Sequence, residues 1–308
     1  MSECCLVCTK PLGPRARGEY HPSCMRKLFG TTRIPFVDVD PATLYLFGQA
    51  MAGKITLSGV QKKIALGWAD RQTLRVVAEH SPFILKPTAD TYPDLPANEH
   101  LTMRLAARAG LETASTGLVR LKDGSLALLV RRFDRTPENR RVPMEDFCQL
   151  NGLYSADKYS GTAELCVRTV RRFSAEPPVD LLRLFRQFLF SWWVGNGDLH
   201  LKNLALLTLE PAAPRLSPAY DLLSTFIVIV GDTLAMSVEG KKSNLSRKTW
   251  NHFGDYAGLA PRVVDGELQR IITLLPVALE EVERSFLRPD LRAKLSSLLT
   301  ERTAVLAP

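Results

Sequence analysis

A short polar turn between two apolar segments constrains this chain more than any other feature. Residues 188–194 read Phe-Leu-Phe-Ser-Trp-Trp-Val, which is typical of a buried helix, and residues 204–209 read as a buried strand. Between them, the six residues from Asp198 to Asn203 hold an acid, a histidine, a lysine and an asparagine. A second acid, Asp221, follows another short apolar stretch. An isolated Asp-x-His is usually a solvated turn, but an acid placed directly after buried structure favours a functional site.

Phosphoryl transfer from ATP requires this set of groups. One carboxylate accepts the proton of the attacking hydroxyl, while an amide oxygen and a second carboxylate hold magnesium against the triphosphate. Asp198 fits the first role, and Asn203 and Asp221 fit the second. Asn203 follows Asp198 by five residues and Asp221 follows it by twenty-three, a spacing typical of a kinase catalytic loop and its metal-binding acid.

A series of motifs between about residues 30 and 225 resembles the HipA-like kinases, the serine/threonine-kinase toxins of bacterial toxin–antitoxin modules. The shorter HipT branch is the most similar. Besides the polar turn, the matching motifs are Ser58-Gly-Val-Gln-Lys-Lys63, Phe83-Ile-Leu-Lys86-Pro87, Asn98-Glu99-His100, Arg131-Arg-Phe-Asp134-Arg135, Glu145-Asp-Phe-Cys-Gln149 and Ala219-Tyr220-Asp221. The resemblance implies an α/β (α+β) fold of the two-lobed protein-kinase type, with a β-rich N-lobe and a helical C-lobe.

Residues 54–66 predict a strand, a turn and a second strand, and Gly59 in the turn allows the backbone to approach phosphates. A single glycine in a hairpin is a weak signal alone. The resemblance identifies this turn as the phosphate-binding loop and implies that it autophosphorylates on Ser58, with Thr56 where relatives place a second serine. The nucleotide-binding residues implied in and around the loop are Thr56, Ser58, Gly59, Val60, Gln61 and Lys62.

Lys86 ends an apolar strand, where a lysine can reach the α- and β-phosphates of a nucleotide. Residues 96–109 predict a helix with Glu99 in its first turn. We expect Glu99 to pair with Lys86, although an acid in a first turn is also favoured by the helix dipole. The resemblance further implies a hinge at which main-chain groups contact adenine, and three more nucleotide contacts. The residues concerned are Arg132, Phe133 and Asp134 in the hinge, and His200, Lys202 and Tyr220.

Four of the six cysteines lie in the first 24 residues. Cys5 and Cys8 are followed after twelve residues by His21 and Cys24, with glycines and prolines between. Three thiolates and one imidazole at this spacing can close a tetrahedral structural zinc site. Cys4 is an alternative to Cys5, and a cysteine-rich tail without metal is the alternative to the whole site.

At 308 residues the chain is long enough for a full core and more than one domain. We expect a Cys/His-rich unit at 1–30, an N-lobe at 31–134 and a C-lobe at 135–308. The net charge of +8 suggests an anionic partner. No secretory leader or membrane-spanning run is evident, so the cytoplasm is the expected location.

The sequence therefore predicts an enzyme that uses ATP and Mg²⁺ to phosphorylate a protein serine or threonine. The resemblance implies an aminoacyl-tRNA synthetase as a target class, a helix-turn-helix antitoxin and a small HipS-like protein as partners, and contact with DNA only through the antitoxin. Two alternatives remain at this stage: a catalytically inert kinase-like binding module, and a small-molecule kinase.

Overall fold

The computed structural model describes residues 3–39, 62–79, 81–89, 91–209 and 213–307. The chain divides into two compact units, each of which makes most of its contacts within itself. The first comprises 1–104, 114–140 and 283–288, and the second comprises 105–113, 141–282 and 289–308. The Cys/His-rich residues 1–30 thus belong to the same unit as the strands that follow them.

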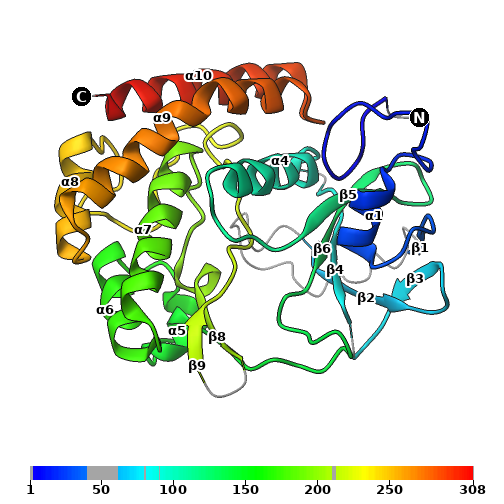
Figure 1. Cartoon of the computed structure of the whole chain (residues 1–308), viewed down its shortest axis with the longest axis horizontal. Coiled ribbons are helices and arrows are strands. Elements are labelled where there is room, and N and C mark those ends of the chain that lie inside the picture. The colour runs from blue at the N-terminus through cyan, green and yellow to red at the C-terminus, as the bar shows by residue number, and fades with distance from the viewer. Residues whose placement is uncertain (1–2, 40–61, 80, 90, 210–212, 308) are drawn as a thin grey trace. The chain divides into compact units, whose positions relative to one another are not determined.

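Within its described residues, the first unit is built on a six-stranded sheet with the order β1-β3-β2-β4-β6-β5 (Figure 1). All neighbouring strands are antiparallel except β1 and β3. The central strands are rich in leucine, isoleucine and valine, which suit a buried pleated surface. The strands are β1 Phe36–Asp38, β2 Ile64–Trp68, β3 Thr73–Val76, β4 Phe83–Lys86, β5 Thr116–Arg120 and β6 Leu126–Arg131.

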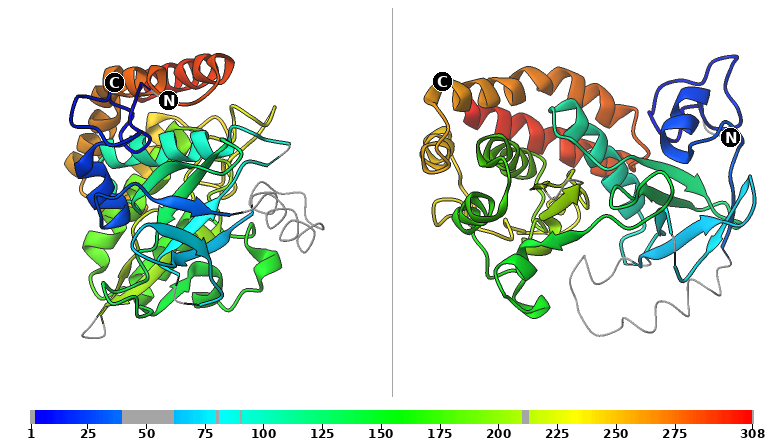
Figure 2. Two further views of the ribbon diagram at one scale, coloured as in Figure 1. Left: turned by 90° about the vertical axis from the view of Figure 1, so that its right-hand side faces the viewer. Right: turned by 60° about the horizontal axis from the view of Figure 1, so that its bottom comes forward.

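Two helices accompany this sheet. Helix α1, Pro22–Phe29, lies beside β6, and Figure 2 shows this N-terminal segment next to the strands. Helix α4, Leu95–Arg108, follows β4 and crosses from the first unit into the second at its last turn. It confirms the helix predicted at 96–109. Gly110 lies just beyond it with a left-handed φ of 85°, a conformation typical of the residue that follows a helix.

The second unit combines helices with a three-stranded sheet of order β7-β8-β9. Helix α7 carries its aromatic core: the rings of Phe185 and Phe253 stack with centroids 5.7 Å apart, and Trp250 meets Phe185 edge-on at 6.0 Å. The elements are β7 Met144–Asp146, α5 Phe147–Leu150, η1 Ser155–Asp157, α6 Ala163–Phe173, α7 Pro177–Trp193, η2 Leu201–Asn203, β8 Ala205–Leu209, β9 Ala213–Leu216, α8 Arg247–Tyr256, α9 Pro261–Glu283 and α10 Pro289–Leu306.

Two local expectations from the sequence, a helical reading from Met144 onward and a strand at residues 234–238, were wrong. Residues 144–146 form a strand instead of opening a helix, because they pair with β8 from Met144–Leu207 to Asp146–Ala205. Residues 234–238, expected as a strand, make only isolated bridges. The sequence also predicts that Pro276 kinks or splits its helix; α9 continues through Pro276 as one helix, so it is not split. Pro276 is exposed, so water can bond to the carbonyl that proline leaves without a helical partner.

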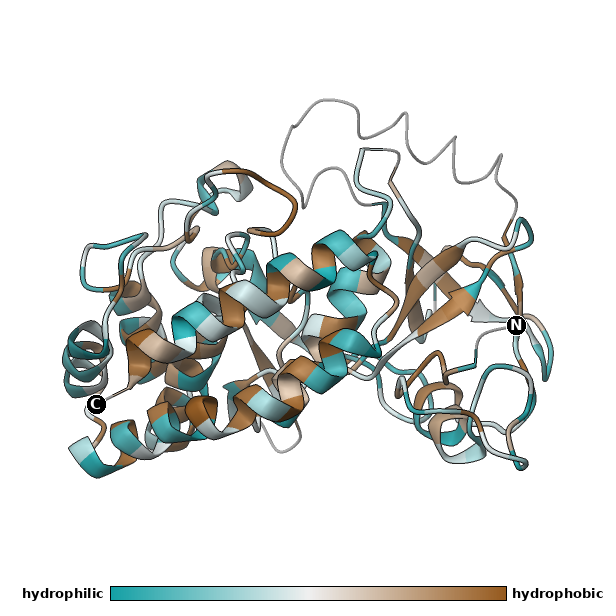
Figure 3. Cartoon of the chain, turned by 90° about the horizontal axis from the view of Figure 1, so that it is seen from above, coloured by the Kyte–Doolittle hydropathy of each residue, from teal (hydrophilic) through white to brown (hydrophobic). Residues whose placement is uncertain are grey.

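Helices α9 and α10 bury one side and expose the other. Apolar and polar residues alternate along both helices in Figure 3, and Leu268, Ile271 and Leu295 are among the residues that they bury. Among the helices of the described residues, none combines the length and apolar character that crossing a bilayer requires.

Candidate active site

The polar turn is held in a tight bend at the end of α7. Gly195 has a φ of 70°, and a Cβ atom there would lie 2.7 Å from Leu298 and 2.8 Å from Phe226. Both the backbone angle and the lack of space require glycine. The carbonyl oxygen of Gly195 accepts a hydrogen bond of 3.1 Å from the backbone N–H of Phe226. These contacts fix the path along which the chain reaches Asp198.

Asp198 is nearly buried, with 7% of its surface exposed, and its backbone is held from both sides. Its N–H donates to Asn196 Oδ1 at 3.0 Å, and its carbonyl oxygen accepts from Asn203 Nδ2 at 2.8 Å. The bond from Asn203 uses the nitrogen end of the amide. The amide oxygen of Asn203, Oδ1, is not used by this bond, and oxygen is the atom type that binds a hard cation.

The segment with Asp221 is tied directly to the polar turn. The hydroxyl of Tyr220 donates to the carbonyl oxygen of Lys202 at 2.8 Å, so the residue before Asp221 bonds to the residue before Asn203. On the other side, the N–H of Ala219 donates to the carbonyl oxygen of Glu112 at 2.8 Å. Asp221 has a φ of 55°, an uncommon conformation for a residue other than glycine that is found at functional sites.

Two other predicted residues of the turn have structural contacts. Lys202 Nζ forms an ion pair of 2.6 Å with Asp146, which also caps helix α5. The His200 ring is buried and meets the ring of Tyr159 edge-on, with centroids 5.1 Å apart. Lys202 is therefore already engaged with a carboxylate, and its contact with phosphate stays a prediction, as do those of His200 and Tyr220.

In the first unit, the predicted ion pair between Lys86 and Glu99 is present. Lys86 Nζ lies 2.5 Å from Glu99 Oε1, and the two side chains are 3% and 1% exposed. Strand β4 delivers the lysine and the first half of α4 delivers the acid. A lysine held in this way by an acid is the arrangement that protein kinases use to contact nucleotide phosphates. The nucleotide contact itself stays a prediction.

The predicted hinge is held by ion pairs and a main-chain bond. Asp134 accepts from Arg132 Nε at 2.8 Å and Nη2 at 2.6 Å, and from Arg135 Nη1 at 2.7 Å. Burial alone would raise the pKa of Asp134, but the bonds from Arg132 and the charges of Arg132 and Arg135 together outweigh it and leave this pKa below its usual value. The backbone N–H of Arg132 donates to the carbonyl oxygen of Pro82 at 2.9 Å. Adenine contacts by Arg132 would therefore have to involve its carbonyl group.

The four predicted zinc ligands come together in the first unit. The ligand atoms of Cys5, Cys8, His21 and Cys24 all lie within 4.8 Å of one another. Cys8 Sγ lies 3.2 Å from His21 Nδ1, and His21 Nε2 lies 3.0 Å from the carbonyl oxygen of Pro11. A proton on Nε2 would leave Nδ1 to bind a metal, as is usual for histidine ligands.

The chemistry of this cluster also fits a cation. Hydrogen bonds from Cys24 and Cys8 lower the pKa of the Cys5 thiol, while the bond with Cys5 raises the pKa of Cys24. The thiols thus oppose one another's full ionisation, and a divalent cation would relieve that repulsion. Cys5 rather than the alternative Cys4 belongs to the cluster.

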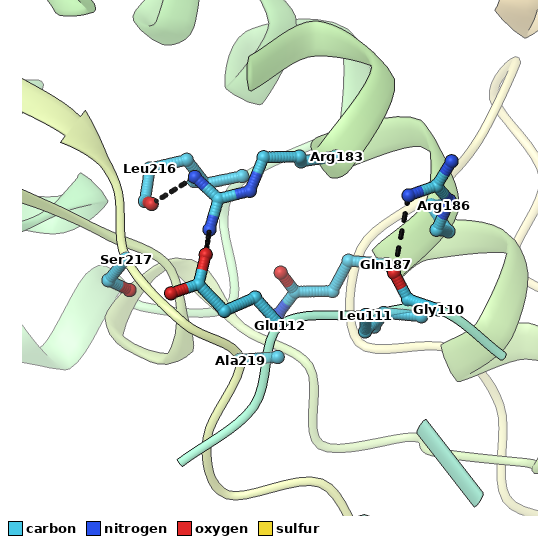
Figure 4. A pocket seen from close by; sticks show the side chains of 9 residues that line it. All are labelled: Gly110, Leu111, Glu112, Arg183, Arg186, Gln187, Leu216, Ser217 and Ala219. Carbon is cyan, nitrogen blue, oxygen red and sulfur yellow. Dashed lines mark hydrogen bonds and ion pairs between the residues drawn. The ribbon is translucent and has the colours of Figure 1, made fainter. Parts of the chain in front are cut away.

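A separate cavity of about 170 Å³ lies in the second unit (Figure 4). Its two arginines already have anionic partners. Arg183 pairs with Glu112 at 2.6 Å and Arg186 pairs with Glu267 at 2.5 Å. Both also donate to main-chain carbonyls, as the dashed lines in Figure 4 show. The arginines serve to join segments of this unit, so they are poorly placed to attract an anionic ligand.

Five predicted residues of the phosphate-binding loop lie outside the described residues: Thr56, Ser58, Gly59, Val60 and Gln61. Lys62 is described and half-buried, two residues before β2 begins. The loop and both predicted autophosphorylation sites therefore stay predictions.

Sequence reasoning missed Tyr159, whose hydroxyl donates to Asp198 Oδ1 at 2.6 Å. The two residues are 39 positions apart, and no local pattern connects them. It also missed Asp146 as the partner of Lys202, although Asp146 lies within one of the motifs used above.

Comparison with known proteins identifies the family. The model of the HipA-like C-terminal domain matches residues 55–278, most of the chain. The chain belongs to the HipA-like C-terminal domain family. This HipA-like chain is 34% identical over 268 residues to the "Putative kinase Y4mE" of Sinorhizobium fredii, an alignment that covers 83% of this chain and 62% of the relative. It is 28% identical to the "Serine/threonine-protein kinase toxin HipA" of Shewanella oneidensis, over 74% of this chain and 57% of the relative.

The fold agrees with that assignment. The HipA-like chain matches the solved HipA of Shewanella oneidensis MR-1, from a complex with HipB and operator DNA, at a TM-score of 0.68 and 22% identity. The match covers 92% of this chain and 69% of the HipA chain. The predicted kinase-like α/β fold is thereby confirmed. The chain spans about three fifths of the length of the curated relatives, so their activities and partners do not pass to it directly. The HipT branch within the family stays a prediction.

Proposed function

We propose that this chain is a Mg²⁺- and ATP-dependent serine/threonine protein kinase that acts as the toxin of a bacterial toxin–antitoxin system. The observation that carries the proposal is the network around the polar turn. Asn203 bonds to the backbone of Asp198, and Tyr220 bonds to the backbone of Lys202. One acid, one amide and a second acid are thus held on segments that are joined by hydrogen bonds.

Each residue of this network has a role in the proposed reaction. Asp198 accepts the proton of a serine or threonine hydroxyl as that oxygen attacks the γ-phosphorus of ATP, and ADP leaves. Asn203 Oδ1 and the carboxylate of Asp221 are the groups that would hold magnesium, which neutralises phosphate charge when bound. Lys86, oriented by Glu99, adds positive charge near the phosphates. The rate enhancement comes from positioning and electrostatics, because no covalent enzyme intermediate is needed.

Partners and substrates follow from the family. A relative is named as a serine/threonine-protein kinase toxin, and the solved HipA is bound to HipB and its operator. We therefore propose a helix-turn-helix antitoxin as the main partner, with DNA contacted through it, and a HipS-like protein as a further candidate. A translation component such as an aminoacyl-tRNA synthetase is the proposed substrate, and Ser58 or Thr56 the autophosphorylation site.

The proposal also includes a structural zinc ion. Cys5, Cys8, His21 and Cys24 provide four protein ligands, which leave no open position for catalysis. The site would stabilise a short segment that has little core of its own.

Phosphate transfer from γ-labelled ATP tests the proposal. Wild type with Mg²⁺ should label itself or co-expressed proteins, and Asp198→Asn should reduce the initial rate by about 10²–10⁴-fold. The matched control is Asp255→Asn, the same change at an exposed acid of the second unit. Phosphoproteomics after expression of wild type and Asp198→Asn would identify the substrate. Equal labelling by wild type and Asp198→Asn would refute the assignment, and no labelling by any folded form would favour an inert binding module.

A further inference from the structure

The proposed base is contacted by a tyrosine from a distant segment. Tyr159 lies two residues after the short helix η1, Ser155–Asp157, and its hydroxyl donates to Asp198 Oδ1 at 2.6 Å. This separation is short for a hydrogen bond between neutral groups and falls in the range of bonds from a hydroxyl to a charged oxygen. One oxygen of the proposed base is therefore held by a phenol.

The ring of Tyr159 is fixed against the same turn. It meets the ring of His200 edge-on, at 5.1 Å between centroids and an interplanar angle of 78°. Lys158 Nζ lies 4.9 Å from the centre of the Tyr159 ring. The backbone of the segment is attached as well, because the N–H of Leu201 donates to the carbonyl oxygen of Lys158 at 3.1 Å. Ring and backbone thus contact residues on the C-terminal side of Asp198.

The chain after Tyr159 approaches the turn closely. A Cβ atom on Gly161 would lie 2.6 Å from a methyl group of Leu201, so only glycine fits at this position without movement. Two residues later the chain is fixed again, since the N–H of Ala163 donates to the carbonyl of Ser237 at 2.9 Å where α6 begins. The position of Tyr159 is therefore set by the fold and does not depend on its bond to Asp198 alone.

We propose that Tyr159 is a positioning residue that orients the Asp198 carboxylate. This inference rests on the proposed kinase function. By holding Oδ1, the phenol limits rotation of the carboxylate and directs Oδ2 to receive the proton of the acceptor hydroxyl. The phenol keeps its own proton throughout, so the proton of the acceptor ends on Asp198.

The alternative is that Tyr159 occupies the position of the acceptor hydroxyl and blocks the site. The structure favours positioning, because the Tyr159 ring packs on His200 and the neighbouring Lys158 carbonyl accepts from the Leu201 N–H. Both of these contacts are to residues of the polar turn. The two possibilities predict opposite changes in rate when the hydroxyl is removed.

Tyr159→Phe tests the inference, since it keeps the ring and removes only the hydroxyl. The matched control is Tyr154→Phe in the same segment, where the side chain is 82% exposed. The measurement is the initial rate of autophosphorylation from γ-labelled ATP with Mg²⁺, at varied ATP concentration. We expect the maximal rate of Tyr159→Phe to fall about 10- to 100-fold, as for loss of a hydrogen bond to a charged group. The half-saturating ATP concentration should stay unchanged, because Tyr159 does not contact nucleotide in this proposal.

The two kinetic parameters separate positioning from a general loss of structure. Misfolding would lower the maximal rate and raise the half-saturating ATP concentration together, whereas loss of positioning lowers the maximal rate alone. Replacement of Tyr159 by 4-fluorophenylalanine, which fills the space of the hydroxyl without donating a hydrogen bond, should show the same fall in rate, and it serves if Tyr159→Phe does not fold. An unchanged maximal rate in both variants would overturn the inference, and a faster Tyr159→Phe would show a block instead. Transfer that survives Asp198→Asn would instead refute the proposed function itself.

Discussion

Removal of Lys86 should destabilise the first unit by several kcal/mol, because the Glu99 carboxylate would stay buried after its lysine is lost. The two side chains are 3% and 1% exposed and lie 2.5 Å apart. Breaking a buried ion pair by removing one partner typically costs about 3–5 kcal/mol. The variant can also avoid the buried charge by protonating Glu99, which sets an upper limit on the loss. Protonating a glutamate of ordinary pKa at pH 7 costs about 3.7 kcal/mol. We therefore expect Lys86→Met to lower the free energy of unfolding by about 3–4 kcal/mol at pH 7.

The sign of the pH dependence follows from the same reasoning. In folded Lys86→Met, a buried carboxyl without its lysine takes up a proton at a higher pH than in the unfolded chain. The deficit of this variant is therefore small near pH 4.3 and grows as the pH rises. At pH 5 the protonation cost is only about 1 kcal/mol. Glu99→Gln should behave differently, because it leaves a buried lysine, whose charge is not removed by lowering the pH.

Urea unfolding at pH 7 and pH 5 measures these effects in wild type, Lys86→Met, Glu99→Gln and the double variant. The double variant should recover most of the loss, since it leaves no unpaired charge. Arg140→Met is the control, because Arg140 and Glu138 are 79% and 65% exposed and 3.8 Å apart; its effect should stay below about 1 kcal/mol. A Lys86→Met deficit that is the same at both pH values, or that persists fully in the double variant, would refute the reasoning.

Two further predictions concern stability elsewhere in the chain. Burial would raise the pKa of Asp180, but the bonds from Arg215, Ser174 and the Leu216 N–H, together with the charge of Arg215, outweigh it and leave this pKa below its usual value. The stabilisation by Asp180 is therefore present above about pH 3.9 and is lost as the pH falls through the lowered pKa. Asp180→Asn should thus lower the free energy of unfolding by about 2–3 kcal/mol at pH 7 and by much less near pH 3, and an equal loss at both would contradict this account. Cys24→Ser should reduce bound zinc, measured by atomic absorption, from about one equivalent per chain and lower the melting temperature, whereas Cys166→Ser should leave the zinc content unchanged. Zinc retained in full by Cys24→Ser would remove the proposed metal site.

The parts of the site that could be predicted from the sequence are those set by local spacing. The buried run of α7, the polar residues after it and the strand β8 follow one another directly, so their arrangement is encoded in one stretch. The zinc-ligand cluster is local in the same way, since all four residues lie within 20 positions of one another. The pairing of Lys86 with Glu99 was predictable because a strand end and the helix after it bring the two together.

The parts that were missed depend on contacts between distant residues. Residues 144–146 have a sequence compatible with a helix, and only pairing with β8 makes them a strand. The contact of Tyr159 with Asp198 spans 39 positions and requires the close approach of Gly161 to Leu201. No periodicity reports such an approach before the fold is known, because it is set by tertiary packing and not by local propensity.

The central claim is that Asn203 and Asp221 bind the metal of Mg²⁺-ATP beside Asp198. The most direct measurement is a crystal structure with a non-hydrolysable ATP analogue and Mn²⁺ in place of Mg²⁺, with the ion located by its anomalous scattering. The account predicts one anomalous peak at bonding distance from Asn203 Oδ1 and the Asp221 carboxylate, with the γ-phosphate of the analogue facing Asp198. Bound analogue with its metal held by other residues, or with its γ-phosphate away from Asp198, would contradict it.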